Sequence, residues 1–399
     1  MGLNDTPLSE RKHIAFFGCR NAGKSSLLNA VTGQKLAIVS DVLGTTTDPV
    51  YKSMELLPAG PVVVIDTPGL DDVGDLGKLR VEKAVGVLNK TDLAILVADA
   101  GKGLNEQDKE ILSKIKEKNL PVIVAYNKTD LTDNGATFTL DGQAKEMNVS
   151  ALNNTGIYEL KEAIAKLLNE ETNERPLVGD LVNVNDLVVL VVPIDKAAPK
   201  GRLILPQQQT IRDLLDNGAV PITCRDSELE GVINKFGKDI KLVITDSQAF
   251  GKIKDIVPRD IPLTSFSILF SRYKGELEHQ LASVNALDEL KDGDTILISE
   301  GCTHHRQCGD IGTEKIPKML SKLGNFNLEF TSGTEFPTDL KKYKVIIHCG
   351  ACMLNDKEMK SRIEASKAGN VAITNYGMTI AKLTGILDRS IEPLKILKK

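Results

Sequence analysis

The feature that most constrains the fold is a phosphate-binding loop near the start of the chain. Residues Gly18 to Ser25 fit the pattern G-x-x-x-x-G-K-[ST], after a predicted strand and before a predicted helix. Gly18 and Gly23 let backbone N–H groups turn toward phosphates, and the helix N-terminus adds partial positive charge. In such a loop Lys24 reaches the β- and γ-phosphates and Ser25 binds Mg²⁺. The loop therefore predicts a nucleoside triphosphate site on an α/β fold.

The first 170 residues alternate between strand and helix patterns. Continuous apolar strands between amphipathic helices are typical of a parallel sheet covered on both faces. We therefore predict a P-loop domain with a parallel-type sheet over residues 1–170. The strands are expected at 13–17, 62–66, 93–99, 121–127 and 146–150, and the helices at 24–31, 105–118 and 157–168.

Further phosphate motifs follow in order. Asp66 and Gly69 belong to an Asp-Thr-Pro-Gly turn, where the carboxylate can hold Mg²⁺ through water and the glycine can contact the γ-phosphate. A threonine-rich segment precedes this turn, and its Thr46 can close on Mg²⁺ when the γ-phosphate is present. The residues that we expect to act in hydrolysis are Lys24, Ser25, Thr46, Asp66 and Gly69.

The base is predicted to be guanine. Asn127-Lys128-Thr129-Asp130 follows an apolar strand, and a carboxylate there can accept both N1–H and the 2-amino group of guanine, which adenine cannot offer. A second Asn-Lys-Thr-Asp at 89–92 precedes its strand, so we interpret it as a helix end. The predicted nucleotide-binding residues are Gly18, Asn21, Gly23, Lys24, Ser25, Asn127, Lys128, Asp130, Ser150 and Ala151.

These motifs resemble those of the translation-factor-like GTPases, and among them the group related to Era and TrmE. Asn21 matches the loop asparagine that helps to hold K⁺ in potassium-activated members, and Leu70 matches the branch without a catalytic glutamine. The resemblance implies binding of GTP and GDP with Mg²⁺, and slow hydrolysis that K⁺ stimulates. Thr47 stands where Era-like members usually carry arginine.

Charge and composition exclude other classes. Fifty Lys and Arg against 54 Asp and Glu give a net charge of −4, and aromatic residues make up 4% with no Trp. This balance argues against a protein that grips nucleic acid or stacks bases. No uncharged apolar run reaches the ~18 residues of a membrane span. Six cysteines are too sparse for a secreted disulfide framework. We expect a cytoplasmic protein with no membrane or nucleic-acid partner.

Two smaller α/β domains are predicted after a polar linker at 169–176, over residues 177–261 and 262–399. The strand at 187–192 has no Lys, Pro or bulge signal that would protect an exposed edge. We therefore expect this strand to pair with its symmetry mate and form a homodimer. The other strands are expected at 220–224, 242–245, 295–299, 328–331 and 345–348, and one long helix at 265–281.

Four of the six cysteines fall in two loops of the last domain. Cys302 and His304 follow one predicted strand, and Cys349 and Cys352 follow another. Both loops are expected at the carboxyl edge of one parallel sheet, where ligands of open α/β sheets collect. Three thiolates with a His or a carboxylate suffice for zinc or for an iron–sulfur cluster. The residues alone leave these two possibilities open.

The combination of Cys-x-His, a long gap and His-Cys-x-x-Cys resembles the maturation GTPases of [FeFe]-hydrogenase, the HydF family. The resemblance covers the whole chain and implies a [4Fe–4S] cluster on Cys302, Cys349 and Cys352. It also implies a scaffold that receives a diiron precursor from the radical-SAM maturases HydE and HydG and delivers it to [FeFe]-hydrogenase. For the fourth position we expect a labile ligand, His304, Asp310, Glu300 or water, rather than Cys308, since a scaffold needs an exchangeable iron.

Two other functions fit parts of the sequence. An RNA-related GTPase of the Era/TrmE kind with a structural zinc would be colourless and would bind RNA tightly. A redox protein gated by GTP would form a reversible Cys349–Cys352 disulfide without metal. The acidic balance and scarce aromatic residues weigh against the first of these.

Overall fold

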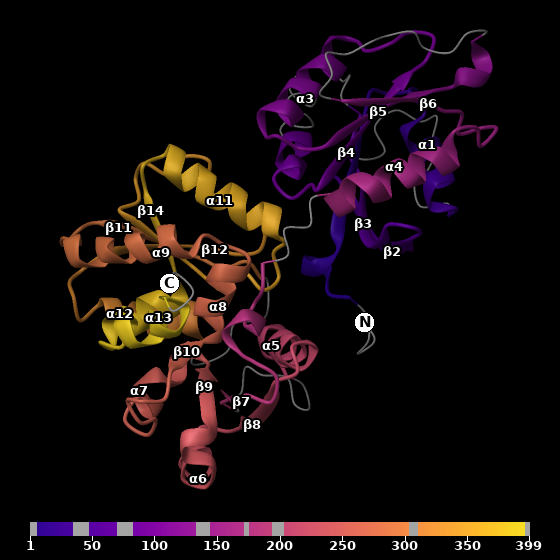
Figure 1. The fold of residues 1–399 in the computed structure, drawn as a ribbon. Coiled ribbons are helices and arrows are strands. Elements are labelled where there is room, and N and C mark those ends of the chain that lie inside the picture. Colours follow the sequence, from indigo (N-terminus) through magenta and orange to yellow (C-terminus); the bar gives the residue numbers. More distant parts are fainter. Residues whose placement is uncertain are drawn as a thin grey trace. The chain divides into compact units, whose positions relative to one another are not determined.

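The computed structural model describes residues 6–34, 48–69, 83–132, 144–170, 175–193, 203–302 and 310–395. The chain forms two compact units, Met1–Asn173 and Glu174–Lys399 (Figure 1). Each unit is built from mainly parallel strands and helices. Within the described ranges, no helix is long and apolar enough to cross a membrane.

The first unit is the predicted α/β domain. Its sheet has the strand order β2-β3-β1-β4-β5-β6, and all neighbours are parallel except β2 and β3. The antiparallel strand β2 was not predicted. The elements are β1 (Lys12–Phe17), α1 (Lys24–Thr32), β2 (Val50–Leu56), β3 (Gly60–Asp66), a helix at 83–88, β4 (Leu93–Asp99), α3 (Glu106–Glu117), β5 (Val122–Asn127), β6 (Lys145–Asn148) and α4 (Ile157–Glu170).

Helices cover both faces of this sheet because its strands are apolar on both sides. In β1, Ile14 and Phe16 pack with helices α1 and α4, whereas Ala15 and Phe17 pack with α3 and the helix at 83–88. Strand β4 divides its residues in the same way. The carboxyl ends of β1, β3, β4 and β5 therefore share one edge, where the predicted motifs lie.

The second unit holds two parallel four-stranded sheets, in the orders β10-β9-β7-β8 and β12-β11-β13-β14. The strands are β7 (Leu187–Val191), β8 (Val220–Cys224), β9 (Ile240–Thr245), β10 (Leu263–Ser265), β11 (Thr295–Ser299), β12 (Asn327–Thr331), β13 (Val345–His348) and β14 (Ala372–Asn375). The helices are α5 (Leu205–Asp216), α6 (Leu229–Phe236), α7 (Phe250–Ile253), α8 (Phe266–Tyr273), α9 (Leu277–Ser283), α10 (Ile316–Leu320), α11 (Asp356–Ala368), α12 (Tyr376–Leu383) and α13 (Leu387–Lys395).

One hydrophobic core joins the two sheets. It contains residues of β7 and β9, of helices α8, α10 and α12, and the side chains of Ile296 and Ile298 on β11. Leu297 points the other way and packs in a smaller core with α11. The core therefore crosses the boundary predicted at residue 261, and whether the two sheets act as separate domains stays a prediction.

Three expectations for this unit need correction. Strand β7 pairs with both β8 and β9, so it has no free edge and cannot join a symmetry mate. The single helix predicted at 265–281 is two helices, because the chain breaks at Lys274–Glu276 around Gly275. Strand β10, placed by prediction in the last domain, pairs with β9 of the middle sheet. Strand β14 and helix α13 were not predicted.

Candidate nucleotide site and candidate metal centre

The phosphate-binding loop has the backbone that its glycines predict. Gly18 has a φ of +146°, and an added Cβ would lie 2.4 Å from the carbonyl oxygen of Val97. Gly23 has a φ of +85°, and an added Cβ would lie 2.3 Å from Nδ2 of Asn127. Either clash would displace the loop, so both positions require glycine. The loop leads into α1, which begins at Lys24.

The predicted catalytic residues of β3 and α1 lie together. Lys24 Nζ forms an ion pair with Asp66 Oδ1, and both side chains are largely buried. Thr67 fixes the start of the turn after β3, since its hydroxyl donates to the Phe16 carbonyl at 2.7 Å. Ser25 lies in the first turn of α1. Gly69 is the last described residue of the turn that follows β3. Thr46 lies outside the described residues.

The guanine motif is tied to the phosphate loop. The Asn127 side chain donates to the Ala22 carbonyl at 3.2 Å and accepts from the N–H of Ala151 at 3.0 Å. Ser150 Oγ donates to Asp130 Oδ1. The structure thus brings the two predicted guanine segments, 127–130 and 150–151, together at one end of the sheet, beside the loop that the phosphates need.

Asp99 is a site residue that the sequence reading missed. It ends β4, and its carboxylate accepts from Lys128 Nζ at 2.9 Å, while the same ammonium donates to the Asn21 carbonyl. Burial would raise the pKa of Asp99, but hydrogen bonds from Lys128 and the Gly101 N–H outweigh it and lower the pKa. The sequence could have indicated it, because Asp99 ends the predicted strand β4, next to the strand that carries the guanine motif.

The second Asn-Lys-Thr-Asp is structural, as predicted. Thr91 and Asp92 lie between the helix at 83–88 and β4, on the opposite edge of the sheet from the phosphate loop. The Asp92 carboxylate accepts the His13 backbone N–H at 2.7 Å, and the Thr91 hydroxyl donates to the Val87 carbonyl at 2.8 Å. These bonds fix the entry to β1 and β4.

The two cysteine loops meet at one sheet edge, as expected. Strands β11 and β13 are parallel neighbours in which Ser299 pairs with His348. Cys349 follows directly, and its Sγ accepts the Gly301 N–H at 3.0 Å and the Ala351 N–H at 3.4 Å. Backbone donors aimed at sulfur stabilise a thiolate and tune iron–sulfur clusters. The donor set of this edge therefore fits a metal–thiolate centre.

The protein alone favours thiols over thiolates here. Burial raises the pKa of Cys349, against the lowering effect of the Gly301 and Ala351 donors and the Arg362 charge. Burial also raises the pKa of Cys352 to about 11; the neighbouring Cys349 adds to this, and the charge of Lys274 opposes it. A bound metal would supply the positive charge that thiolates need.

The remaining predicted ligands are only partly placed. Cys302 directly follows Gly301, but His304 and Cys308 lie outside the described residues. Asp310 is engaged locally, because its Oδ1 accepts the Thr313 N–H at 2.7 Å and the Thr313 hydroxyl at 2.8 Å. In the ranges that the structure describes, no three His, Cys, Asp or Glu side chains are grouped to hold a metal ion.

His348 supports the loop and is not placed as a ligand. Its side chain is fully buried, and Nε2 accepts from Arg362 at 2.9 Å because a guanidinium can only donate. Nδ1 then carries the proton and donates to the Cys349 carbonyl at 2.9 Å. Burial and the Arg362 charge lower the pKa of His348 to about 3. Arg362 also pairs with Glu358 at 2.9 Å.

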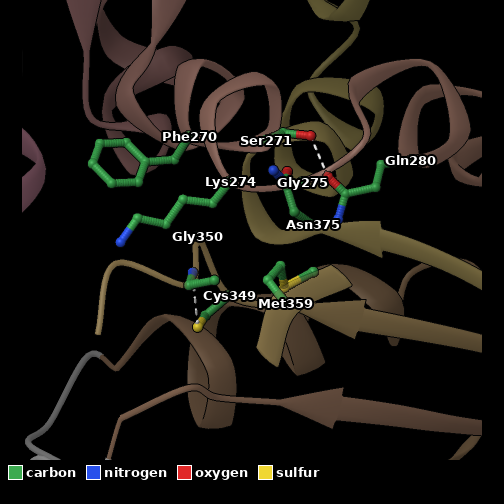
Figure 2. A pocket seen from close by; sticks show the side chains of 10 residues that line it. Phe270, Ser271, Lys274, Gly275, Gln280, Cys349, Gly350, Met359 and Asn375 are labelled. Carbon is green, nitrogen blue, oxygen red and sulfur yellow. Dashed lines mark hydrogen bonds between the residues drawn. The ribbon is translucent and has the colours of Figure 1, made fainter. Parts of the chain in front are cut away.

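A small hollow adjoins the cysteine loop. Figure 2 shows Lys274 and Phe270 on one wall, from the end of α8, and Cys349 and Gly350 on the facing wall. Lys274 is fully buried, and its Nζ donates to the Leu354 carbonyl at 3.1 Å. This buried cation had no signal in the sequence.

Three family models match the chain in tandem. The model described as 50S ribosome-binding GTPase matches residues 13–128. The hydrogen maturase F dimerization domain matches residues 177–275, and the hydrogen maturase F tetramerization domain matches residues 278–393. The boundary between the last two lies after α8, beyond the residue 261 that we predicted.

Curated relatives match part of the chain. The tRNA modification GTPase MnmE of Nitrosomonas europaea is 33% identical over 167 residues, which are 42% of this chain and 37% of that protein. MnmE of Acetivibrio thermocellus is 35% identical over 188 residues, 45% of this chain and 40% of that protein. The chain thus spans less than half the length of these relatives. A solved structure of Aquifex aeolicus Era bound to GDP·AlF4⁻ is 21% identical, with 56% of this chain and 98% of that one covered and a TM-score of 0.35.

The first unit with its phosphate and guanine motifs defines a P-loop GTPase, which binds GTP and GDP with Mg²⁺. The two hydrogen maturase F models together match more than half of the chain, on the second unit. The chain belongs to the hydrogen maturase F (HydF) family, as the sequence predicted. The two matched domains of the second unit are named for dimerization and tetramerization, which supports self-association of this chain.

Proposed function

We propose that this chain is a GTP-regulated scaffold that holds a [4Fe–4S] cluster and delivers a diiron precursor to [FeFe]-hydrogenase in the cytoplasm. The observation that carries this proposal is the cysteine edge, where Cys349 interacts with Cys352 and its sulfur accepts two backbone N–H groups, one of them from Gly301, which precedes Cys302. The radical-SAM maturases HydE and HydG would supply the precursor. The RNA-related alternative is weaker, because the MnmE relatives match about half of this chain or less, whereas the hydrogen maturase F models match residues 177–275 and 278–393.

Cys302, Cys349 and Cys352 would hold the cluster, with the fourth position on His304 or Asp310. When bound, the cluster would offer one exchangeable iron to the incoming diiron cargo. Other residues of the chain support the cysteine loop. The N–H groups of Gly301 and Ala351 donate to Cys349 Sγ, and Arg362 donates to His348 Nε2 and so fixes the ring under the loop. Soft thiolates select iron or zinc over hard cations.

In the first unit, Lys24 would neutralise phosphate charge, and Asp130 with Ala151 would bind guanine. Ser25, Asp66 and Thr46 would hold Mg²⁺, which when bound spreads the charge of the transferring phosphate. Gly69 would meet the γ-phosphate, so its turn after β3 would respond to hydrolysis.

The deciding experiment is an iron and acid-labile sulfide assay on anaerobically purified full chain, with an absorption spectrum. We expect about four iron and four sulfide per chain, as the proposed cluster type requires, and a brown protein that gives an electron-spin resonance signal after reduction. Zinc in place of iron would reject the cluster and favour the structural-zinc alternative. A metal-free protein with a Cys349–Cys352 disulfide would favour the redox alternative.

We expect GTP hydrolysis to be faster in K⁺ than in Na⁺ at equal ionic strength. Asn21 has a positive φ of +59° and an exposed position in the phosphate loop, and its carbonyl accepts from Lys128 Nζ. Initial rates in the two salts measure the effect. Asn21→Ala should remove the difference between the salts, whereas equal rates for the unchanged protein would contradict a K⁺ site.

The homodimer is proposed to form through the outer edge of β8. The N–H of Val220 donates to Asp186 and the carbonyl of Cys224 accepts from Val192, so alternate groups of β8 face β7. By alternation, Pro221 and Thr223 face outward. Pro221 has no N–H, which leaves Thr223 as the outward donor within β8.

Thr223→Pro is expected to weaken dimerisation at least about fivefold, the equivalent of one hydrogen bond of roughly 1 kcal/mol. The ladder to β7 keeps its donors. Light scattering over a concentration series measures the dissociation constant, with Thr223→Val as the control that keeps the N–H. A Thr223→Pro protein that dimerises like this control would exclude the β8 edge.

A further inference from the structure

Lys274 is the least expected side chain of the second unit. It follows α8, its side chain is fully buried, and it lies along the hollow whose opposite wall is Cys349 and Gly350 (Figure 2). Lysine is almost never fully buried unless a partner compensates its charge. The Leu354 carbonyl, at 3.1 Å from Nζ, lies two residues beyond Cys352. Lys274 is thus bonded to the cysteine loop itself.

This lysine reaches the site from the other sheet. Helix α8 follows β10, which pairs with β9 of the middle sheet. Residue 274 therefore lies in the part matched by the dimerization domain, whereas the cysteines lie in the part matched by the tetramerization domain. Two further contacts make the same junction: Asn375 Nδ2 donates to the Ser267 carbonyl at 2.9 Å, and Lys315 Nζ donates to Gln248 Oε1.

The charge at this edge calls for a cation. With a metal bound, three thiolates would carry three negative charges, and a carboxylate, Glu300, lies buried near Cys349. Arg362 is the second buried cation, and it reaches the loop through His348 from α11. Arg362 is already paired with Glu358 at 2.9 Å, so its charge is partly compensated.

We propose that Lys274 is the electrostatic partner of the cysteine site, a cation supplied by the middle sheet that retains an anionic metal–thiolate centre and raises its reduction potential. The inference rests on the proposed function, because it assigns a role toward the cluster proposed there. Net charge and burial set the potentials of such clusters. Charge interactions are strong where water is excluded.

The test compares three substitutions at one position in the full chain. Lys274→Met removes both charge and hydrogen bond, Lys274→Gln removes the charge but keeps a donor for the Leu354 carbonyl, and Lys274→Arg keeps the charge. Lys252→Met is the matched control, since its exposed side chain pairs with Asp226 on the surface and its loss changes the net charge equally. GTP hydrolysis and circular dichroism report whether each variant is folded.

Two readouts are taken. The first is the midpoint potential of the reconstituted cluster, titrated with dithionite and followed by electron-spin resonance. We expect Lys274→Met and Lys274→Gln to lower the reduced-to-oxidised ratio at least tenfold at fixed potential, a fall of at least about 59 mV for one electron. The second is Co²⁺ binding to the metal-free protein, followed by thiolate-to-metal absorption, where we expect at least a tenfold loss of affinity.

Lys274→Arg and Lys252→Met should match the unchanged protein in both readouts. If Lys274→Gln also matches it, the lysine serves only as a hydrogen-bond donor and the inference is wrong. If all variants match, or if the cysteines of the unchanged protein bind no Co²⁺, the inference is equally wrong. Absence of iron and sulfide from the unchanged protein would instead reject the proposed function, while the Co²⁺ comparison still decides the role of Lys274.

Discussion

Lys24→Ala is expected to reduce the rate of GTP hydrolysis at least about 100-fold, the loss typical of removing one preorganised charge-stabilising donor. Lys24 begins α1 in the phosphate loop, and its ammonium is largely buried against Asp66. The nearby Lys128 cannot replace it, because Asp99 and the Asn21 carbonyl hold its ammonium. Phosphate release under saturating GTP measures the effect.

The matched control for this variant is Lys109→Ala. Lys109 is an exposed lysine of α3 in the same unit, and it pairs with Glu106 at the surface. Its loss removes the same charge from the unit far from the loop in sequence. We expect hydrolysis by Lys109→Ala to stay within twofold of the unchanged rate, as surface ion pairs contribute little. Substantial turnover by Lys24→Ala would refute the assigned role.

Cys349→Ser is expected to abolish cluster binding. The thiolate is the soft ligand at this position, and its sulfur is the acceptor of both Gly301 and Ala351 N–H groups. The loss of iron should exceed the roughly 10–100-fold effect that removal of an outer-shell partner has on metal affinity. Iron and sulfide content after anaerobic reconstitution measures it. Cys302→Ser and Cys352→Ser should behave in the same way.

Cys224→Ser is the internal control for these variants. Cys224 is a buried free cysteine at the end of β8 in the same unit, and burial raises the pKa of its thiol to about 11. Its serine variant should keep its iron. Cys308→Ser should also keep it if the fourth position is labile. Equal loss of iron from Cys308→Ser and Cys349→Ser would make Cys308 a ligand and overturn the open-site proposal.

The strands and motifs of the first unit followed from the sequence because they depend on local pattern. A continuous apolar run such as β4 indicates by itself that the strand is buried on both faces. The phosphate loop is recognisable because its glycines must stand at a fixed spacing. Strand β2 was not predicted, because most of its residues are exposed and its sequence lacks a clear alternation of apolar and polar residues. Its place depends on antiparallel pairing with β3, which no local signal encodes.

Strand β7 was wrongly predicted to be an edge strand, although its sequence indicates a central one. Its residues Val188–Val191 are fully buried, and such continuous apolar runs belong to central strands of parallel sheets. The edge strands of this sheet are β10 and β8, and β8 carries Pro221 at an outward position. By contrast, Lys274 and Arg362 could not have been found, because a charged residue after or within a helix ordinarily points to solvent. The burial of Lys274 depends on where the two sheets meet, and that of Arg362 depends on its hydrogen bonds to His348 of β13 and to the Gly333 carbonyl.

The core that spans both sheets of the second unit has a thermodynamic consequence. Residues from β7 to α13 share it, and Arg389 of α13 donates to carbonyls of the loop before β10, including those of Lys254 at 3.0 Å and Val257 at 2.9 Å. Neither sheet can open without exposing apolar surface of the other. Residues 174–399 should therefore melt in a single cooperative transition, and a fragment cut at residue 261 would lose half of its interior.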